Sequence, residues 1–226
     1  MLACAAAGLL LSCAARAQLS ASVSVDSDYR VRGVSLSGSK PTVRLTANID
    51  TASGWYGGAS ATQAEVSQGD RYAQIVGYAG YAMPIAAGRA LEFGASYSHF
   101  MSNRQYDFAE AYAGLLSERW SLRLNYSPEY FGRPVQTAYL DASGHLPLTD
   151  IARLFGHIGL LAPVGGGDPA ITQANRSRAD LRVGMGWALR ELDLQIAWTA
   201  VSRGGPFPAL YDQRRSALLV SASYSF

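Results

Sequence analysis

The chain has 226 residues and a formal net charge of +2, with 16% charged and 49% hydrophobic residues. Soluble domains carry roughly 25% charged residues, so this composition favours a chain that keeps one face in lipid. The net charge is too small to indicate binding to nucleic acid, and we expect no nucleic-acid partner.

Residues 1–17 are predicted to be a cleavable signal peptide. Residues 1–11 are apolar and small, and Ala15-Arg16-Ala17 forms an A-x-A cleavage site. A competing interpretation is lipidation at Cys13, because Leu10-Leu11-Ser12-Cys13 resembles a lipobox. Both cysteines, Cys4 and Cys13, lie in this segment. Cleavage after Ala17 therefore leaves no thiol for a disulfide or a metal site.

Residues 18–226 are predicted to form one antiparallel β-barrel. Apolar and polar residues alternate with a period of two, which indicates strands with two different faces. Twelve strands are expected, at about 19–33, 39–50, 55–65, 71–82, 90–100, 106–116, 119–129, 135–144, 152–162, 177–189, 191–201 and 214–226. Segments 55–64, 71–82 and 152–162 are rich in glycine and alanine, so alternation does not assign their faces. Many strands reach the 9–11 residues that a membrane span needs, which favours a transmembrane barrel over a soluble lipocalin-like one.

The connections and the last strand support the same prediction. Connections after even strands are short, whereas the two longest, 163–176 and 202–213, follow odd strands, as in barrels with periplasmic turns and extracellular loops. Aromatic residues near strand ends are expected to form interfacial girdles: Tyr29, Trp55, Tyr56, Tyr97, Phe100, Trp120, Tyr126, Tyr130, Trp187, Trp198 and Tyr224. Tyr224 and the terminal Phe226 resemble the signal read by the barrel-assembly machinery. That machinery and outer-membrane lipid are the expected partners.

One motif connects the chain to a known family. Ser27-Asp28-Tyr29-Arg30-Val31-Arg32-Gly33-Val34-Ser35, followed by Lys40-Pro41, resembles the S-D-Y-R-F-R-G-x-S … P segment that opens the TorF-type porins, proteobacterial outer-membrane proteins of largely uncharacterised function. The similarity continues to the C-terminus, with Val31 in place of the usual Phe and Pro128 in place of a small residue or Asp. The resemblance implies a porin-like barrel and leaves its solute open.

The same motif concentrates charge on one face of the first predicted strand. Asp26, Asp28, Arg30 and Arg32 share one parity, about 6.6 Å apart, within reach of Arg44 or, if the last strand closes on the first, of Ser221 and Ser223. They form either a charged constriction that sets ion preference or a salt-bridge network that only neutralises interior charge. The predicted lumen-lining set is Asp26, Asp28, Arg30, Arg32, Arg44, Glu92, Glu110, Arg123, Glu129, Asp180, Arg182 and Asp193. Because both signs are well represented, no strong ion selectivity follows.

The sequence does not predict an enzyme, a cofactor or a metal site. No G-x-S-x-G elbow surrounds a serine, and among the three histidines His99 is the best candidate base for a barrel-embedded acyl hydrolase. Asp168 lacks the D-x-D-x-D pattern of a calcium loop. We therefore expect a passive channel for small hydrophilic solutes. The alternative is a closed structural or surface-binding barrel that acts through its extracellular loops. Homo-oligomerisation is left open.

Overall fold

The structure is a computed structural model that describes residues 18–67, 69–166, 176–206 and 214–226. The expected signal peptide, the Cys13 alternative and Asp168 lie outside the described residues, as do parts of the two longest loops.

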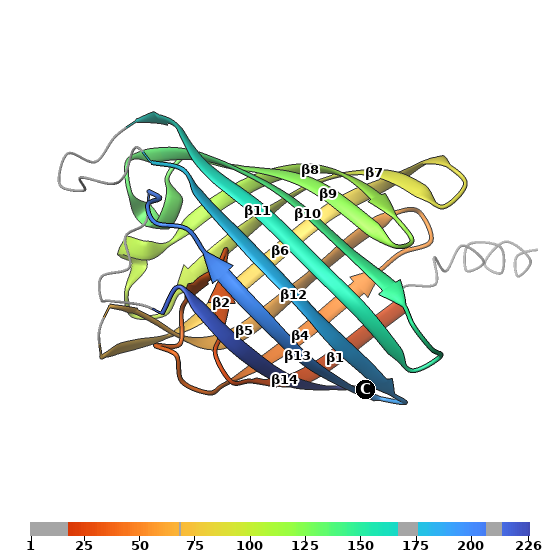
Figure 1. The fold of residues 1–226 in the computed structure, drawn as a ribbon. Helices are drawn as coiled ribbons and strands as arrows, with labels where there is room; N and C mark the ends of the chain where they lie inside the picture. Colours follow the sequence, from red (N-terminus) through yellow and green to blue (C-terminus); the bar gives the residue numbers. More distant parts are fainter. Residues whose placement is uncertain (1–17, 68, 167–175, 207–213) are drawn as a thin grey trace, which may run out of the picture.

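Twelve strands of the described residues close into an antiparallel barrel (Figure 1). Val25 pairs with Ala222, so the last strand closes on the first, and the backbone N–H of Phe226 donates to Ala21. Closure leaves no edge strand, which a barrel in lipid requires. The strands are β1 (Gln18–Asp26), β4 (Thr42–Asp50), β5 (Trp55–Ser67), β6 (Asp70–Ala86), β7 (Arg89–Phe100), β8 (Phe108–Ser117), β9 (Trp120–Ser127), β10 (Val135–Pro147), β11 (Ala152–Gly166), β12 (Arg178–Leu189), β13 (Leu192–Val201) and β14 (Ser216–Ser225). The prediction of a twelve-stranded antiparallel barrel is confirmed.

The alternation along the strands separates an apolar exterior from a polar lumen. Leu45, Phe93 and Ile196 are examples of large apolar side chains that are exposed on the outside. A soluble protein rarely exposes a continuous apolar surface of this kind, whereas a barrel in the bacterial outer membrane presents it to lipid. Six predicted girdle aromatics are exposed: Trp55, Tyr97, Trp120, Tyr126, Trp198 and Tyr224.

The connections differ between the two ends of the barrel. Short turns join β4–β5, β6–β7, β8–β9, β10–β11 and β12–β13 at the end where the C-terminus lies (Figure 1). The other end carries most of the longer connections, including the 3₁₀ helices η1 (Arg104–Tyr106) and η2 (Tyr130–Gly132). The β5–β6 connection is an exception, since β5 ends at Ser67 and β6 begins at Asp70. We call these the turn end and the loop end, which correspond to the periplasmic and extracellular sides of an outer-membrane barrel.

No helix among the described residues is long and apolar enough to cross a membrane.

The first strand differs from the prediction. It ends at Asp26 rather than continuing to residue 33, and β2 (Arg30–Val31) and β3 (Val34–Ser35) form a separate hairpin inside the barrel (Figure 1). The hairpin turns at Arg32 and Gly33, whose φ angles of 49° and 76° are those of a type I′ turn. Asp28, Arg30 and Arg32 therefore lie on this hairpin segment and not on the barrel wall.

Candidate functional site in the barrel lumen

The β2–β3 hairpin is fixed in the lumen by Arg32. Its Nη2 donates to both carboxylate oxygens of Glu110 on β8, at 2.7 and 2.9 Å. The guanidinium also lies over two tyrosine rings, 4.3 Å from the centroid of Tyr139 and 5.1 Å from that of Tyr130. Arg32 and Glu110 are largely buried, so this pair is poorly screened by water. One side chain thus ties the hairpin to β8, β10 and η2.

Asp28 and Gly33 fix the rest of the hairpin. Asp28 accepts hydrogen bonds from Ser35, Ser37 and the Nε of Arg30, the last at 2.7 Å. Gly33 lies against the barrel wall, where a Cβ atom would come within 2.7 Å of the Cβ of Asp180 and 2.8 Å of that of Val201. Only glycine fits both this close approach and the positive φ.

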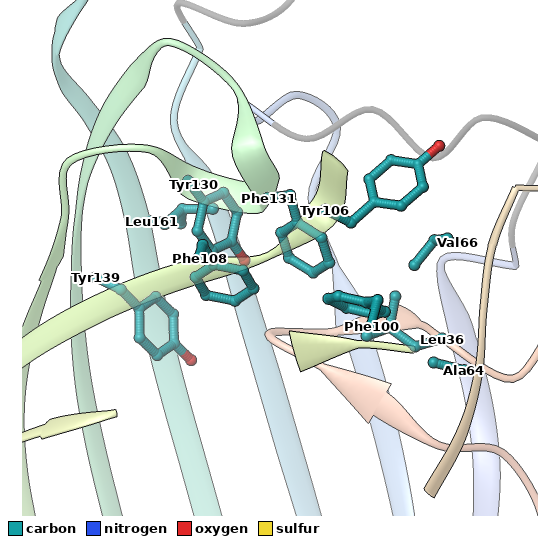
Figure 2. Packing of buried hydrophobic residues seen from close by; sticks show 10 residues of the cluster. All are labelled: Leu36, Ala64, Val66, Phe100, Tyr106, Phe108, Tyr130, Phe131, Tyr139 and Leu161. Atoms are coloured by element: carbon teal, nitrogen blue, oxygen red, sulfur yellow. The ribbon is translucent and has the colours of Figure 1, made fainter. Parts of the chain in front are cut away.

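An aromatic cluster fills the lumen beside the hairpin at the loop end (Figure 2). Phe108 stacks on Phe131 with ring centroids 4.7 Å apart, and Tyr130 meets Phe131 edge-on at 4.9 Å. Such ring pairs stabilise a cluster by about 0.5–1.5 kcal/mol each beyond their burial. The cluster consists of Leu36, Ala64, Val66, Phe100, Tyr106, Phe108, Tyr130, Phe131, Tyr139 and Leu161. Phe100 and Tyr130 were expected in the girdles, and that expectation is wrong, because both rings are buried inside the barrel.

A hydrogen-bonded chain on the wall supports the tyrosine under Arg32. Ser143 Oγ lies 2.8 Å from His157 Nδ1, and His157 Nε2 lies 2.9 Å from the Tyr139 hydroxyl and 3.2 Å from Asp180. The residue types are those of a serine–histidine–aspartate relay. Here, however, Nε2 is shared with Tyr139, and the serine bonds to the other nitrogen. We interpret the chain as a support that holds the Tyr139 ring in place.

A second cluster surrounds Glu92 on β7. Its carboxylate accepts from Arg123 Nε at 2.7 Å, from Arg123 Nη2 at 3.0 Å and from the Tyr56 hydroxyl at 2.8 Å. The Arg123 guanidinium lies 4.7 Å from the ring centroid of Tyr112. Tyr56, expected in a girdle, therefore faces the lumen. Glu92 is almost fully covered by these partners, while the Arg123 side chain is partly exposed.

A polar cavity of about 680 Å³ occupies the lumen between the turn end and the hairpin. Its wall includes residues 117–120 at the β8–β9 turn and extends to Arg32 and Gly33. Asp26 and Arg44 face each other across the β1–β4 pair, 3.2 Å apart, and Arg182 donates to Gln195. The cavity therefore combines guanidinium, carboxylate, hydroxyl and imidazole groups.

The structure brings together most of the predicted lumen residues. Seven line the cavity: Asp26, Asp28, Arg30, Arg32, Arg44, Asp180 and Arg182. Four others are held in ion pairs of the barrel interior: Glu92 with Arg123, Glu110 with Arg32, and Asp193 with Arg153. The prediction for Glu129 is wrong. β9 ends at Ser127, so Glu129 is an exposed residue of the following loop, next to η2.

Sequence reasoning missed six charged or histidine residues of the cavity wall: Glu118, Arg119 and His145 near the turn end, and Asp141, Arg153 and His157 farther along the strands. Asp141 shares the inward parity of Tyr139 and Ser143, so alternation along β10 was a sufficient signal. Arg153 and His157 belong to the glycine- and alanine-rich segment 152–162, where one face is hardly more polar than the other. The residues of this segment that face the lumen could therefore not be assigned from its sequence alone.

His99 belongs to a loop-end cluster, not to the cavity. Its Nδ1 lies 2.8 Å from Asp107, which also accepts from the Tyr97 hydroxyl and from the backbone N–H of Phe100. Burial would raise the pKa of the Asp107 carboxyl, but these hydrogen bonds hold it below its ordinary value. In the part of the chain that the structure describes, no group of three or more His, Cys, Asp or Glu residues is placed to hold a metal ion.

Comparison with solved structures finds the same barrel fold in two porins and in a third protein, LpxR. The NanC porin matches with a TM-score of 0.61 and 10% identity, covering 92% of this chain and 99% of that one. The KdgM porin in complex with disordered oligogalacturonate matches with a TM-score of 0.57 and 12% identity, covering 92% and 98%. LpxR from Salmonella typhimurium, at 0.51 and 11%, covers 92% and 99%. Identities this low show a shared fold and no more.

Comparison with sequences gives the family. No curated protein matches the chain. The model of one family, described as "Bacterial protein of unknown function (Gcw_chp)", matches residues 12–224. The TorF resemblance is not confirmed by name and stays a prediction. The chain belongs to the Gcw_chp family of bacterial proteins and has the barrel fold of outer-membrane porins.

Proposed function

We propose that the protein is an outer-membrane channel for the passive diffusion of small hydrophilic solutes, with the β2–β3 hairpin and the aromatic cluster as its internal gate. The observation that carries the proposal is the polar cavity of about 680 Å³ inside a barrel whose exterior is apolar. At about 30 Å³ per water molecule, such a volume holds roughly 20 waters. A hydrated interior of this size accommodates a small polar solute.

The position of the hairpin supports a gate. The cavity ends at Arg32 and Gly33, and beyond them the loop end of the lumen is packed with buried aromatic rings. A solute that enters from outside must displace this packing. The hairpin is held to the wall at few points: Arg32 bonds to Glu110, and Arg30 donates to the backbone carbonyl of Arg214. We propose that it leaves the lumen as a unit when these contacts break. Loop rearrangements of this kind take place on the microsecond-to-millisecond timescale.

The fold of the KdgM and NanC porins is a secondary support. KdgM is described in complex with oligogalacturonate, so a barrel of this architecture accommodates a hydrophilic solute. In this proposal outer-membrane lipid surrounds the exterior of the barrel. Tyr224 and Phe226, exposed at the end of β14, are the residues that the barrel-assembly machinery would recognise. We propose no catalytic role, and His99 serves to order the loop around Asp107.

A second candidate is favoured by one observation. Phe100, Tyr130, Phe131 and Leu161 are almost completely buried within the lumen, as in the core of a soluble domain. If this packing is permanent, the barrel is a closed structural or surface-binding protein that acts through its extracellular loops.

Single-channel recording in a planar bilayer separates the two candidates. We expect stepwise current from the purified protein, and a higher open probability after Gly33→Val, whose side chain overlaps Asp180 and Val201. Gly69→Val is the matched control, since Gly69 also has a positive φ but no neighbouring atom within 4 Å of a Cβ. Silence of both wild type and Gly33→Val, with incorporation verified by antibody or label, contradicts the channel and favours the closed barrel.

A further inference from the structure

We infer that the cavity selects and binds small anions that carry a carboxylate or a phosphate group. The inference rests on the proposed channel for its transport role, but the binding site itself requires only the cavity. The wall of the cavity contains nearly equal numbers of positive and negative side chains, but the two kinds are not equally accessible to a solute. Six arginines and five carboxylates line the cavity: Arg30, Arg32, Arg44, Arg119, Arg153 and Arg182, with Asp26, Asp28, Glu118, Asp141 and Asp180.

Burial largely removes three of the five wall carboxylates, Asp26, Asp28 and Asp180, from the solute. The side chains of Asp28 and Asp180 are only 6% and 5% exposed, because serines, Arg30, Tyr139 and His157 cover them. Asp26 is 14% exposed, whereas its partner Arg44 is 37% exposed. In the neighbouring cluster Glu92 is 1% exposed and Arg123 39%. In the Asp26–Arg44 and Glu92–Arg123 pairs the short carboxylate lies against the wall and the long guanidinium is the more exposed member, so a solute meets the positive end first.

Three pairs do not follow this pattern. Arg30 and Asp28 are both buried on the hairpin, with side-chain exposures of 5% and 6%. Arg153 and Asp193 are about equally exposed, so this pair adds little net field. Arg32 and Glu110 are both buried and belong to the hairpin anchor. Arg119 and Glu118 are both exposed at the turn end and offset each other, so the cationic character of the cavity depends on Arg44 and Arg182.

Arg182 is the stronger of these positions. Among the described residues it forms no ion pair: its Nη2 donates to Gln195, its guanidinium lies 5.3 Å from the Phe155 ring centroid, and its Nε has no hydrogen-bond partner. An interior charge without a direct ion-pair partner is costly, and an anion that enters the cavity lowers that cost. Low-dielectric walls also focus the field of such a charge along the lumen.

The chemistry of guanidinium defines the ligand class. Its planar fork of N–H donors matches the paired oxygens of carboxylates and phosphates, and it binds them more strongly than a neutral donor does. The Arg182 side chain shares the cavity with the partly exposed Ser221, whose hydroxyl is a hydrogen-bonding group for a polar solute. The volume of about 680 Å³ limits the ligand to a small molecule.

Reversal potentials across a KCl gradient test the selectivity. Potassium and chloride have similar mobilities, so a non-zero potential reports the pore. We expect the wild type to prefer chloride, and Arg182→Gln to lower the anion-to-cation permeability ratio roughly two- to fivefold, from the field of one charge at about 8 Å in water. Arg182→Lys should retain the preference. Arg89→Gln, at the exposed β6–β7 turn, should leave it unchanged.

Binding in detergent tests the site without conduction. Inorganic phosphate and acetate, each added to the purified protein, should raise its unfolding temperature, and Arg182→Gln and Arg44→Gln should weaken the effect at least severalfold. The two salts separate phosphate from carboxylate recognition. A conducting barrel with cation preference, or with a ratio that Arg182→Gln does not change, overturns the inference and leaves the channel standing. Anion binding by a barrel that never conducts supports the site and refutes the channel. Absence of binding by either salt, with no anion preference, refutes the site.

Discussion

The hairpin anchor gives the sharpest prediction about the gate. Arg32→Ala removes both contacts to Glu110 and the stacking on Tyr130 and Tyr139, and leaves Glu110 in the lumen without its partner. Breaking a buried ion pair by removing one member costs about 3–5 kcal/mol, and each cation–π contact contributes about 0.5–2 kcal/mol. Water that reaches the remaining Glu110 charge reduces this cost, so we take the lower end, about 3 kcal/mol, as the loss of free energy of docking. This corresponds to a roughly 150-fold shift of the hairpin from docked to undocked.

Cysteine labelling measures this shift directly. Leu36 is 1% exposed in the aromatic cluster, next to the hairpin. In a chain that begins at Gln18, which has no native cysteine, Leu36→Cys should react slowly with a membrane-impermeant maleimide. Adding Arg32→Ala should raise the labelling rate by up to about 150-fold, since only the undocked state reacts.

Arg104→Ala is the matched control, because Arg104 is 83% exposed and only weakly paired with Asp107. It should leave the labelling rate of Leu36→Cys within about twofold of the parent, as expected of a surface pair. A rate for Arg32→Ala that is no higher than that of Arg104→Ala would refute the reasoning, since the hairpin would then be held by something other than its arginine.

Three further predictions concern stability and assembly. Arg123→Ala leaves Glu92 buried without its partner and should lower the free energy of unfolding in detergent by about 2–3 kcal/mol. This loss is smaller than for a fully buried pair, because Arg123 is partly solvated. Arg89→Ala should have no measurable effect. Because the folded-state pKa of Asp107 is lowered, its contribution should be complete above the ordinary value of 3.8 and be lost as pH falls through the lowered pKa. Unfolding midpoints measured against pH should show this loss, and Asp107→Asn should abolish it. Deleting Phe226, which is exposed at the end of β14, should reduce the amount of barrel recovered in outer-membrane fractions; wild-type recovery contradicts its role as an assembly signal.

Alternation predicted the barrel well because each strand has one face in lipid and the other in a polar lumen, so its residues must alternate between apolar and polar. Leu45 and Arg44 are adjacent in sequence and lie on opposite sides of the wall, one exposed to lipid and the other to the cavity. The same physical contrast recurs in every confidently faced strand. Segment 152–162 does not show this alternation, because glycine and alanine are compatible with both the lipid-facing and the lumen-facing side of the wall. There the facing of Arg153 and His157 is set by pairing with β10 and β12.

The hairpin and the aromatic cluster were not predictable in this way. Residues 27–35 alternate as regularly as a barrel strand, and a two-stranded hairpin has the same period as the strand it replaces. The Arg32-Gly33 turn was a local hint. The decisive partner, Glu110, is 78 residues away and could not be assigned from sequence. Tyr130 and Phe100 show the same limit, because an aromatic residue near a strand end suits an interfacial girdle or a packed lumen equally well.

The two hypotheses about the charged motif each hold for a different part of it. Asp28, Arg30 and Arg32 are less than 10% exposed and form ion pairs or hydrogen bonds with one another, with serines or with Glu110, which is the behaviour of a neutralising network. Its effect is to lock the hairpin across the lumen. Arg44, which pairs with Asp26, remains exposed to the cavity, as does Arg182 on the opposite side of the closing seam between β1 and β14. The charged residues that hold the hairpin across the lumen are therefore buried, whereas Arg44 and Arg182 are accessible to a solute in the cavity. Substitutions in the first group should change how often the barrel opens, and substitutions in the second should change which ion passes.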